Sequence, residues 1–120
     1  MQLSIRMKLF KYASNIYATM KTEVCPVVEA IKVIGTKWRL VIIRYLLDKP
    51  KGFNELKKMT KASSRTLSRT LHHLIAQNIV ERKILQSSPI SVEYSLTKRG
   101  KDLNKILEQM GVWSKKWKIC

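Results

Sequence analysis

The stretch Ser-Ser-Arg-Thr-Leu-Ser-Arg-Thr-Leu-His-His-Leu-Ile-Ala-Gln-Asn, residues 63–78, decides how the rest of this sequence is interpreted. Its aliphatic residues recur at the spacing of one apolar stripe on an α-helix. They are Leu67, Leu71, Leu74 and Ile75. Ser63 suits the N-cap, because its hydroxyl can accept from the free N–H groups of the first turn. The stretch therefore predicts an amphipathic helix that begins after Ser63.

The other face of this predicted helix carries hydrogen-bond donors and no carboxylate. Its residues are Ser64, Arg65, Thr66, Ser68, Arg69 and His72, with His73 at the flank. Arg65 and Arg69 are one turn apart, so both can face one segment of a DNA major groove, and guanidinium forks fit base edges and phosphates. We take this set as candidate DNA-contacting residues. The alternatives are a solvated helix face, or phosphate contact alone for one arginine.

The composition favours an anionic partner. The chain has 120 residues, enough for one domain, and 24 Lys and Arg against 8 Asp and Glu give a net charge of +16. Double-stranded DNA is the simplest partner for such a charge, and an anionic membrane is the competitor. The longest uncharged stretch near the N-terminus, residues 12–20, is too short and too polar for a spanning helix or a signal peptide. We expect a cytoplasmic protein with no membrane partner.

The remaining sequence predicts a mainly α fold with a small β-hairpin wing, which is a winged helix-turn-helix that dimerises through terminal helices. Helices are expected over residues 26–34, 37–47 and 53–59, with a turn at 60–62 before the helix that follows Ser63. Strands are expected over 79–85 and 92–96 around a turn at 86–90. One last helix, weakened at Gly111, is expected after Thr97. The predicted organisation is an N-terminal extension over 1–22, helical and dimer-associated or frayed, a DNA-binding domain over 23–97, and a dimerisation helix over 98–120.

Further cations lie near predicted helix starts or on the wing strands, where phosphate contacts are natural. They are Lys37, Lys51, Arg82 and Lys83. Each has the alternative of being a solubilising residue only. The last helix carries an apolar stripe longer than one small domain needs, which we assign to a dimer interface. Its residues are Leu103, Ile106, Met110, Trp113 and Trp117. Packing against the chain's own domain is the alternative.

An enzyme is not expected. The sequence shows no phosphate-cradling Gly-rich loop, no ordered Ser, His and Asp set, and no paired carboxylates among its scattered acidic residues. Cys25 and Cys120 match no metal-ligand spacing, so neither a metal nor a cofactor is predicted. Cys25 falls at the predicted N-cap of the first helix, where the positive end of the helix favours a reactive thiolate. A half-buried cysteine that only packs is the alternative.

Six blocks in this order resemble the HxlR-type winged-helix transcriptional regulators. They are Cys25-Pro-Val-Val-Glu-Ala, Ile34-Gly-Thr-Lys-Trp-Arg, Phe53-Asn-Glu-Leu, Leu67-Ser-Arg-Thr-Leu, Ile79-Val-Glu-Arg and Val92-Glu-Tyr-Ser-Leu-Thr-Lys-Arg-Gly. The resemblance implies a homodimer that binds an inverted-repeat operator through two recognition helices. It also implies a redox or electrophile sensor at the position of Cys25, and hence an oxidant or small-molecule effector.

The chain departs from the family's pattern at two positions, Gly52 and Ser91, where many members have a basic residue. Both departures remove expected cations, so recognition of DNA is expected to depend more on Arg65 and Arg69. The alternative function is an architectural winged-helix protein that binds DNA without sequence preference.

Overall fold

The structure is a computed structural model that describes residues 25–119, except for the side chains of Gln86 and Ser87. The described residues belong to two compact units that divide after Gly35. The extension expected over residues 1–22 lies outside the described residues, as does Cys120.

The first unit contains α2, Pro26–Ile34, as the sequence predicted. Pro26 occupies the start of the helix, where its missing N–H costs no hydrogen bond. Cys25 is the N-cap residue, with extended backbone and no hydrogen bond from its side chain to the helix. Gly35 ends the helix, and its N–H donates to the Ile31 carbonyl at 2.7 Å. A Cβ at Gly35 would overlap that same carbonyl oxygen, so the close approach requires glycine.

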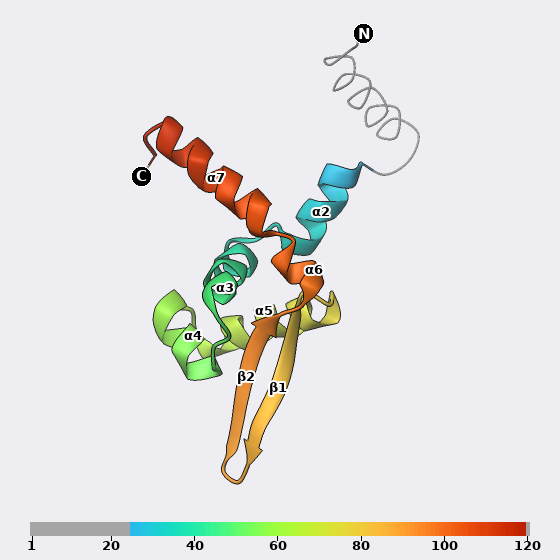
Figure 1. The fold of residues 1–120 in the computed structure, drawn as a ribbon, viewed down its shortest axis with the longest axis vertical. Coiled ribbons are helices and arrows are strands. Elements are labelled where there is room, and N and C mark those ends of the chain that lie inside the picture. The colour runs from blue at the N-terminus through green and yellow to red at the C-terminus, as the bar shows by residue number, and fades with distance from the viewer. Residues whose placement is uncertain (1–24, 120) are drawn as a thin grey trace. The chain divides into compact units, whose positions relative to one another are not determined.

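The second unit holds the remaining elements (Figure 1). They are α3 (Lys37–Asp48), α4 (Phe53–Thr60), α5 (Ser64–Ala76), β1 (Val80–Ser87), β2 (Ile90–Leu96), α6 (Lys98–Lys101) and α7 (Asn104–Lys116). The predicted fold, mainly α with a two-stranded hairpin, is confirmed. Helix α3 is the central helix, because Ile42 and Ile43 are fully buried and α4, α5, α7 and β2 all contact it. No helix of residues 25–119 is long and apolar enough to span a bilayer.

The hairpin is longer than predicted. β1 and β2 pair antiparallel from Val80 opposite Leu96 to Ser87 opposite Ile90, so the turn is reduced to Ser88 and Pro89, which are joined by a cis peptide bond. The backbone of Lys51 extends the ladder on the other side of β2. Its N–H donates to the Tyr94 carbonyl at 3.0 Å, and the Tyr94 N–H donates back at 2.8 Å. The loop between α3 and α4 is therefore tied to the hairpin.

The region after Thr97 forms two helices, whereas the sequence predicted one helix weakened at Gly111. Thr97 caps α6 by accepting from the Gly100 N–H at 3.1 Å. The Thr97 hydroxyl also donates to the Asn78 carbonyl at 2.7 Å, and its backbone N–H donates to the Ile79 carbonyl at 3.0 Å. A Cβ at Gly100 would overlap the Ile79 carbonyl oxygen. These contacts hold α6 against the corner between α5 and β1, and α7 starts after the turn at 102–103.

Candidate nucleic-acid interface

Helix α5 has the two faces that the sequence predicted. Its inner face buries Leu67, Leu71 and Leu74 almost completely. Ser63 is the N-cap, and its Oγ accepts from the Thr66 N–H at 3.1 Å. The helix ends before Asn78, which takes a left-handed conformation at φ 59° that asparagine tolerates better than most residues. The apolar stripe thus fixes the rotation of α5 about its axis and decides which residues face outward.

A tight turn joins α4 to α5. Lys61 ends α4 with φ 63°, and its N–H donates to the Lys57 carbonyl at 2.9 Å. The Thr60 hydroxyl accepts from the Ala62 N–H at 3.1 Å, and Ala62 is buried. A short helix, a turn of three residues and a second helix with an exposed outer face form the helix-turn-helix arrangement.

The outer face of α5 presents most of the predicted residues to solvent. Ser64, Arg65, Arg69 and His72 are exposed, and Thr66 and Ser68 are half-buried. The Thr66 Oγ1 accepts from the Ser63 hydroxyl at 3.1 Å, so this side chain is held by its own helix end. Within the described part of the chain, neither Arg65 nor Arg69 forms a salt bridge. No acidic residue lies in the first turn of α5. Both guanidinium groups are therefore available to an anionic partner.

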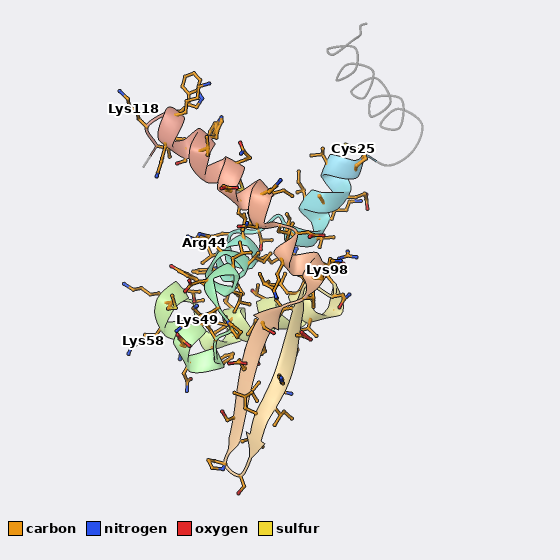
Figure 2. The ribbon with its side chains drawn as sticks, in the orientation of Figure 1. Cys25, Arg44, Lys49, Lys58, Lys98 and Lys118 are labelled. Carbon is orange, nitrogen blue, oxygen red and sulfur yellow. The ribbon has the colours of Figure 1, made fainter. Side chains whose placement is uncertain are left out.

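Sequence reasoning missed a group of lysines beside this face. Lys57 and Lys58 lie in the last turn of α4 and Lys61 in the turn, and all three are exposed. Figure 2 shows Lys58 on α4 with its side chain directed away from the ribbon. The sequence contained a signal for them. The spacing of Phe53, Leu56 and Met59 predicts one apolar face of this helix, which leaves Lys57 and Lys58 on its other face. These lysines extend the positive surface along the α4–α5 turn.

The cations expected on the wing and at the start of α3 are exposed but differ in their surroundings. Lys37 places its Nζ 4.6 Å from the centre of the Trp38 ring. Arg82 lies opposite Tyr94 on β2, and Lys83 lies opposite Glu93. The carboxylate facing Lys83 reduces the local positive charge, so Arg82 is the stronger candidate for a phosphate contact.

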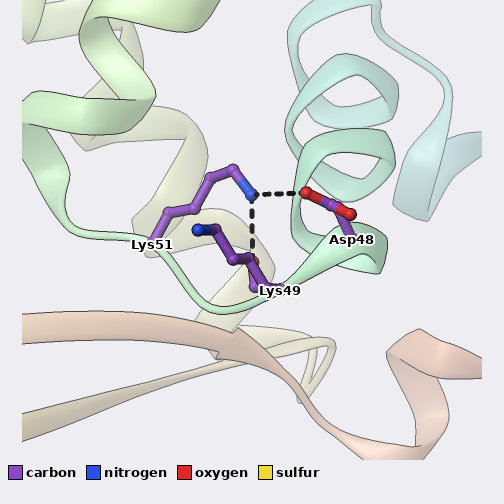
Figure 3. A network of polar contacts seen from close by, with 3 residues as sticks. All are labelled: Asp48, Lys49 and Lys51. Atoms are coloured by element: carbon purple, nitrogen blue, oxygen red, sulfur yellow. Dashed lines mark hydrogen bonds and ion pairs between the residues drawn. The ribbon is translucent and has the colours of Figure 1, made fainter.

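Lys51 does not lie where the sequence placed it. Its side chain is only 1% exposed, and the Nζ lies 3.4 Å from an Asp48 carboxylate oxygen and 3.3 Å from the Lys49 carbonyl oxygen (Figure 3). The expectation of a phosphate contact at Lys51 is therefore wrong for this arrangement. The ladder contact with Tyr94 explains the difference, because it draws Lys51 between α3, α4 and β2 and turns its side chain inward.

The burial of Lys51 leads to a stability prediction. Lys51→Ala removes a buried aliphatic stem and is expected to lower the free energy of unfolding by about 2–4 kcal/mol. Lys51→Met keeps the stem and loses two long hydrogen bonds, one of them to the largely exposed Asp48, so a loss under about 1 kcal/mol is expected. Urea unfolding of both variants checks this. Equal losses for the two variants would show that the ammonium group, not the stem, stabilises the fold.

Helix α7 exposes the apolar stripe that the sequence predicted. Trp113 and Trp117 are 58% and 63% exposed, and Ile106 and Met110 are also exposed, while Leu103 is half-buried. Ile106, Met110, Trp113 and Ile119 line an apolar hollow on this helix. Leu107 lies on the other side and lines a hollow with α3 residues such as Leu40 and Arg44. Met110 lines both hollows, so the stripe borders the side of α7 that packs on α3, while Ile106 and Trp113 line only the first hollow.

Two further features concern cysteine and metal-binding chemistry. Cys25 is a free, half-buried cysteine at the start of α2. Among residues 25–119 no group of three or more His, Cys, Asp and Glu side chains is arranged to hold a metal ion.

The chain is similar to a group of known transcriptional regulators. A family model described as HxlR-like helix-turn-helix matches residues 33–119. The HTH-type transcriptional regulator YdeP of Bacillus subtilis (strain 168) is 34% identical over 103 residues, which cover 85% of this chain and 80% of YdeP. The HTH-type transcriptional regulator YodB of the same organism is 34% identical over 97 residues, covering 79% of this chain and 87% of YodB. The redox regulator HypR in its oxidized form is a solved structure 36% identical to this chain, with a TM-score of 0.72 over 77% of this chain and 96% of HypR.

Proposed function

The chain belongs to the HxlR-like helix-turn-helix family of transcriptional regulators, and from this membership we propose that it binds an inverted-repeat operator in double-stranded DNA as a homodimer. The family resemblance and the winged-helix fold expected from the sequence are both confirmed. In the proposal, α5 of each copy enters the major groove, and cations around it contact the phosphates.

One observation carries the DNA-binding proposal. The outer face of α5 presents Arg65 and Arg69 to solvent on a helix whose rotation is fixed by three buried leucines. An arginine can bind the O6 and N7 atoms of guanine with two hydrogen bonds, which discriminates between bases. Lys57, Lys58 and Lys61 beside the turn supply sequence-independent phosphate contacts. The net charge of +16 fits the same partner.

The homodimer rests on α7. A stripe with two tryptophans more than half exposed to solvent is the kind of surface that aromatic anchors form at protein interfaces. In our proposal α7 of one copy packs on α7 of the other copy. This interface sets the distance between the two α5 helices.

Selection of DNA from a random pool tests the function. We expect enriched duplexes to contain two inverted half-sites about 34 Å apart, one turn of the double helix. Competition of the selected palindrome against random duplex at fixed salt then gives a specificity ratio, expected to be about a thousandfold or more. A ratio near one would favour the alternative, an architectural protein without sequence preference.

Regulation through Cys25 is the finer part of the proposal. The thiol is free at the N-cap of α2, and solved structures similar to this chain include quinone-bound YodB and diamide-treated YodB. We propose that modification of the Cys25 thiol changes DNA binding. The alternative is a cysteine that only packs.

A cysteine variant distinguishes a regulatory Cys25 from a Cys25 that only packs. Benzoquinone is expected to weaken operator binding by the wild-type protein at least about tenfold, because addition of the Cys25 thiolate to the quinone ring forms a thioether with a bulky, polar hydroquinone at the start of the helix. Cys25→Ser is expected to keep its affinity under the same treatment, and Cys120→Ser serves as the control. Equal sensitivity of wild type and Cys25→Ser would rule out this cysteine as the sensor.

A further inference from the structure

A hollow between α3, α4 and α7 has no part in the proposed DNA and dimer contacts, and we call it the α3–α7 hollow. It has a volume of about 690 Å³ and lies within the second unit. Sites for small molecules occupy about 300–1,000 Å³. Most of its walls are aliphatic or sulfur-containing, from Leu40, Val41, Met59, Leu107 and Met110. Methionine side chains adapt to irregular shapes, so the hollow suits the apolar body of a small molecule.

Three residues of α3 bring polar and aromatic groups to the same hollow. They are Arg44, Tyr45 and Asp48. The Asp48 carboxylate is compensated by the Lys51 ammonium, which lies 3.4 Å away. Arg44 is exposed (Figure 2) and forms no salt bridge within residues 25–119. The charge at this hollow that lacks a partner is therefore the Arg44 guanidinium.

One carboxylate of α7 lies near Arg44 without neutralising it. Glu108 and Arg44 both line a smaller hollow of about 270 Å³ beside the α3–α7 hollow. No ion pair joins these two side chains. A guanidinium group presents parallel N–H groups that match the two oxygens of a carboxylate. Arg44 thus remains available to an anionic group of a ligand.

Gly111 opens the α7 wall of the hollow. It lies in the interior of α7, where glycine destabilises a helix relative to alanine. A Cβ at this position would meet no atom within 4 Å, so no contact among the described residues requires glycine there. Glycine also serves where a ligand approaches the backbone closely. The missing side chain leaves space that a larger residue would fill.

We propose that the α3–α7 hollow binds a small aromatic carboxylate as an effector. The carboxylate accepts hydrogen bonds from Arg44, and the aromatic body lies against Gly111 and among the methionines. Sulfur–aromatic contacts and the Tyr45 ring favour an aromatic body over an aliphatic one. Binding of the ligand does not involve DNA, and only the effector role rests on the proposed function.

The effector role follows from the helices that meet at the hollow. Met59 lies at the end of α4, directly before the turn that leads to α5. Met110 also lines the hollow on the α7 stripe. A ligand between these residues contacts the helix-turn-helix and the proposed dimerisation helix at once. It therefore favours the arrangement of the two that it fits best, and its binding is coupled to operator binding.

A titration of the full, isotope-labelled chain with 2-naphthoate tests the site without DNA. Proton–nitrogen correlation spectra follow the glycine amides, and of the 4 glycines only Gly111 lines the hollow. We expect a saturable shift of the Gly111 signal with a dissociation constant of about 1 mM or lower. The Gly100 signal is expected to stay in place. The uncharged analogue 2-naphthamide is expected to bind about fivefold or more weakly than 2-naphthoate.

Two variants locate the ligand, with other amides of the lining followed in the same spectra. Arg44→Met removes the charge and is expected to weaken 2-naphthoate about fivefold or more, with 2-naphthamide unaffected. Gly111→Leu fills the hollow and is expected to abolish binding of both compounds. Its urea midpoint should not fall, because leucine favours a helix more than glycine. Lys49→Met removes a charge just after α3, outside the lining, and serves as the control that binds like wild type.

Fluorescence anisotropy with the duplex selected from the random pool tests the effector role. Saturating 2-naphthoate is expected to change the operator affinity of wild type about fivefold or more, and that of Gly111→Leu not at all. If wild type does not prefer the selected duplex over random DNA, the proposed function fails. The titration without DNA still decides whether the hollow binds the carboxylate.

Other results overturn the inference in identifiable ways. No saturable shift, or equal binding of 2-naphthoate and 2-naphthamide, would refute a site for carboxylates. Binding that persists in Gly111→Leu would place the ligand elsewhere, such as the hollow beside Trp113. A smaller sedimentation coefficient of Gly111→Leu without ligand would identify the hollow as a seat for a second copy of the chain. Unchanged operator affinity at saturation would refute the effector role.

Discussion

The double variant Arg65→Ala, Arg69→Ala is expected to lose specific operator binding while keeping its fold. Each bidentate arginine–guanine contact contributes roughly 1–3 kcal/mol of discrimination, and a dimer holds two copies of each, so the specific affinity should fall by roughly a thousandfold or more. Both side chains are exposed and form no salt bridge within the described residues, so their removal leaves no buried partner behind. The measurement is a titration of the selected duplex and of random duplex at one salt concentration.

The matched control is Arg99→Ala, an exposed arginine on α6. It removes one arginine, where the double variant removes two, from a helix outside the outer face of α5, and specific binding should change by less than about threefold. Circular dichroism and urea unfolding verify that all variants are folded. An equal loss on the selected and the random duplex would leave the specificity ratio unchanged and would assign both arginines to phosphate contacts. No loss on either duplex would mean that this face of α5 does not contact DNA.

The second large effect is expected at the α7 stripe. Trp113→Glu places a carboxylate in the centre of the proposed interface, and the loss of one tryptophan anchor together with the burial of a charge should convert the dimer to a monomer. Sedimentation velocity measures the change. Operator affinity should then fall by two orders of magnitude or more, because a monomer contacts one half-site only.

Lys115→Glu is the control for this variant, since it introduces the same residue in the same helix. At about 100° per residue, Lys115 projects from the side of α7 opposite Trp113 and Trp117. The control is expected to stay dimeric. A Trp113→Glu variant that sediments as a dimer would mean that another surface joins the two copies.

Much of the fold could be predicted because its signals are local. The spacing of Leu67, Leu71 and Leu74 defined α5 and its outer face, and the Ser63 cap fixed where it begins. Pro26 and Gly35 marked the two ends of α2 in the same way. In each case the residue that starts or stops the helix acts within one turn of the chain, so no distant contact is needed to interpret it.

The errors lie where distant segments meet. From the sequence alone, Lys51 is expected to be a surface cation. Its side chain turns inward because its backbone pairs with Tyr94, which lies 43 positions further along the chain (94 − 51). Thr97 was recognised as a cap, but its second hydrogen bond, to the Asn78 carbonyl, follows from the fold. The break between α6 and α7 could not be seen for the same reason. The bases that Arg65 and Arg69 would contact in the proposed complex depend likewise on the DNA sequence as well as on the chain.

The corner where Thr97 and Gly100 meet the Ile79 carbonyl joins the part of the chain that carries α5 to the part that carries the α7 stripe. Helix α7 has 13 residues, or about 20 Å of length, so a change of about 10° in its direction at this corner would displace its far end by about 3 Å. In a dimer joined through α7, such a displacement changes how far apart the two recognition helices stand. For the dimer proposed above, the accepted spacing of half-sites would thus depend on a glycine and a threonine that lie outside the outer face of α5.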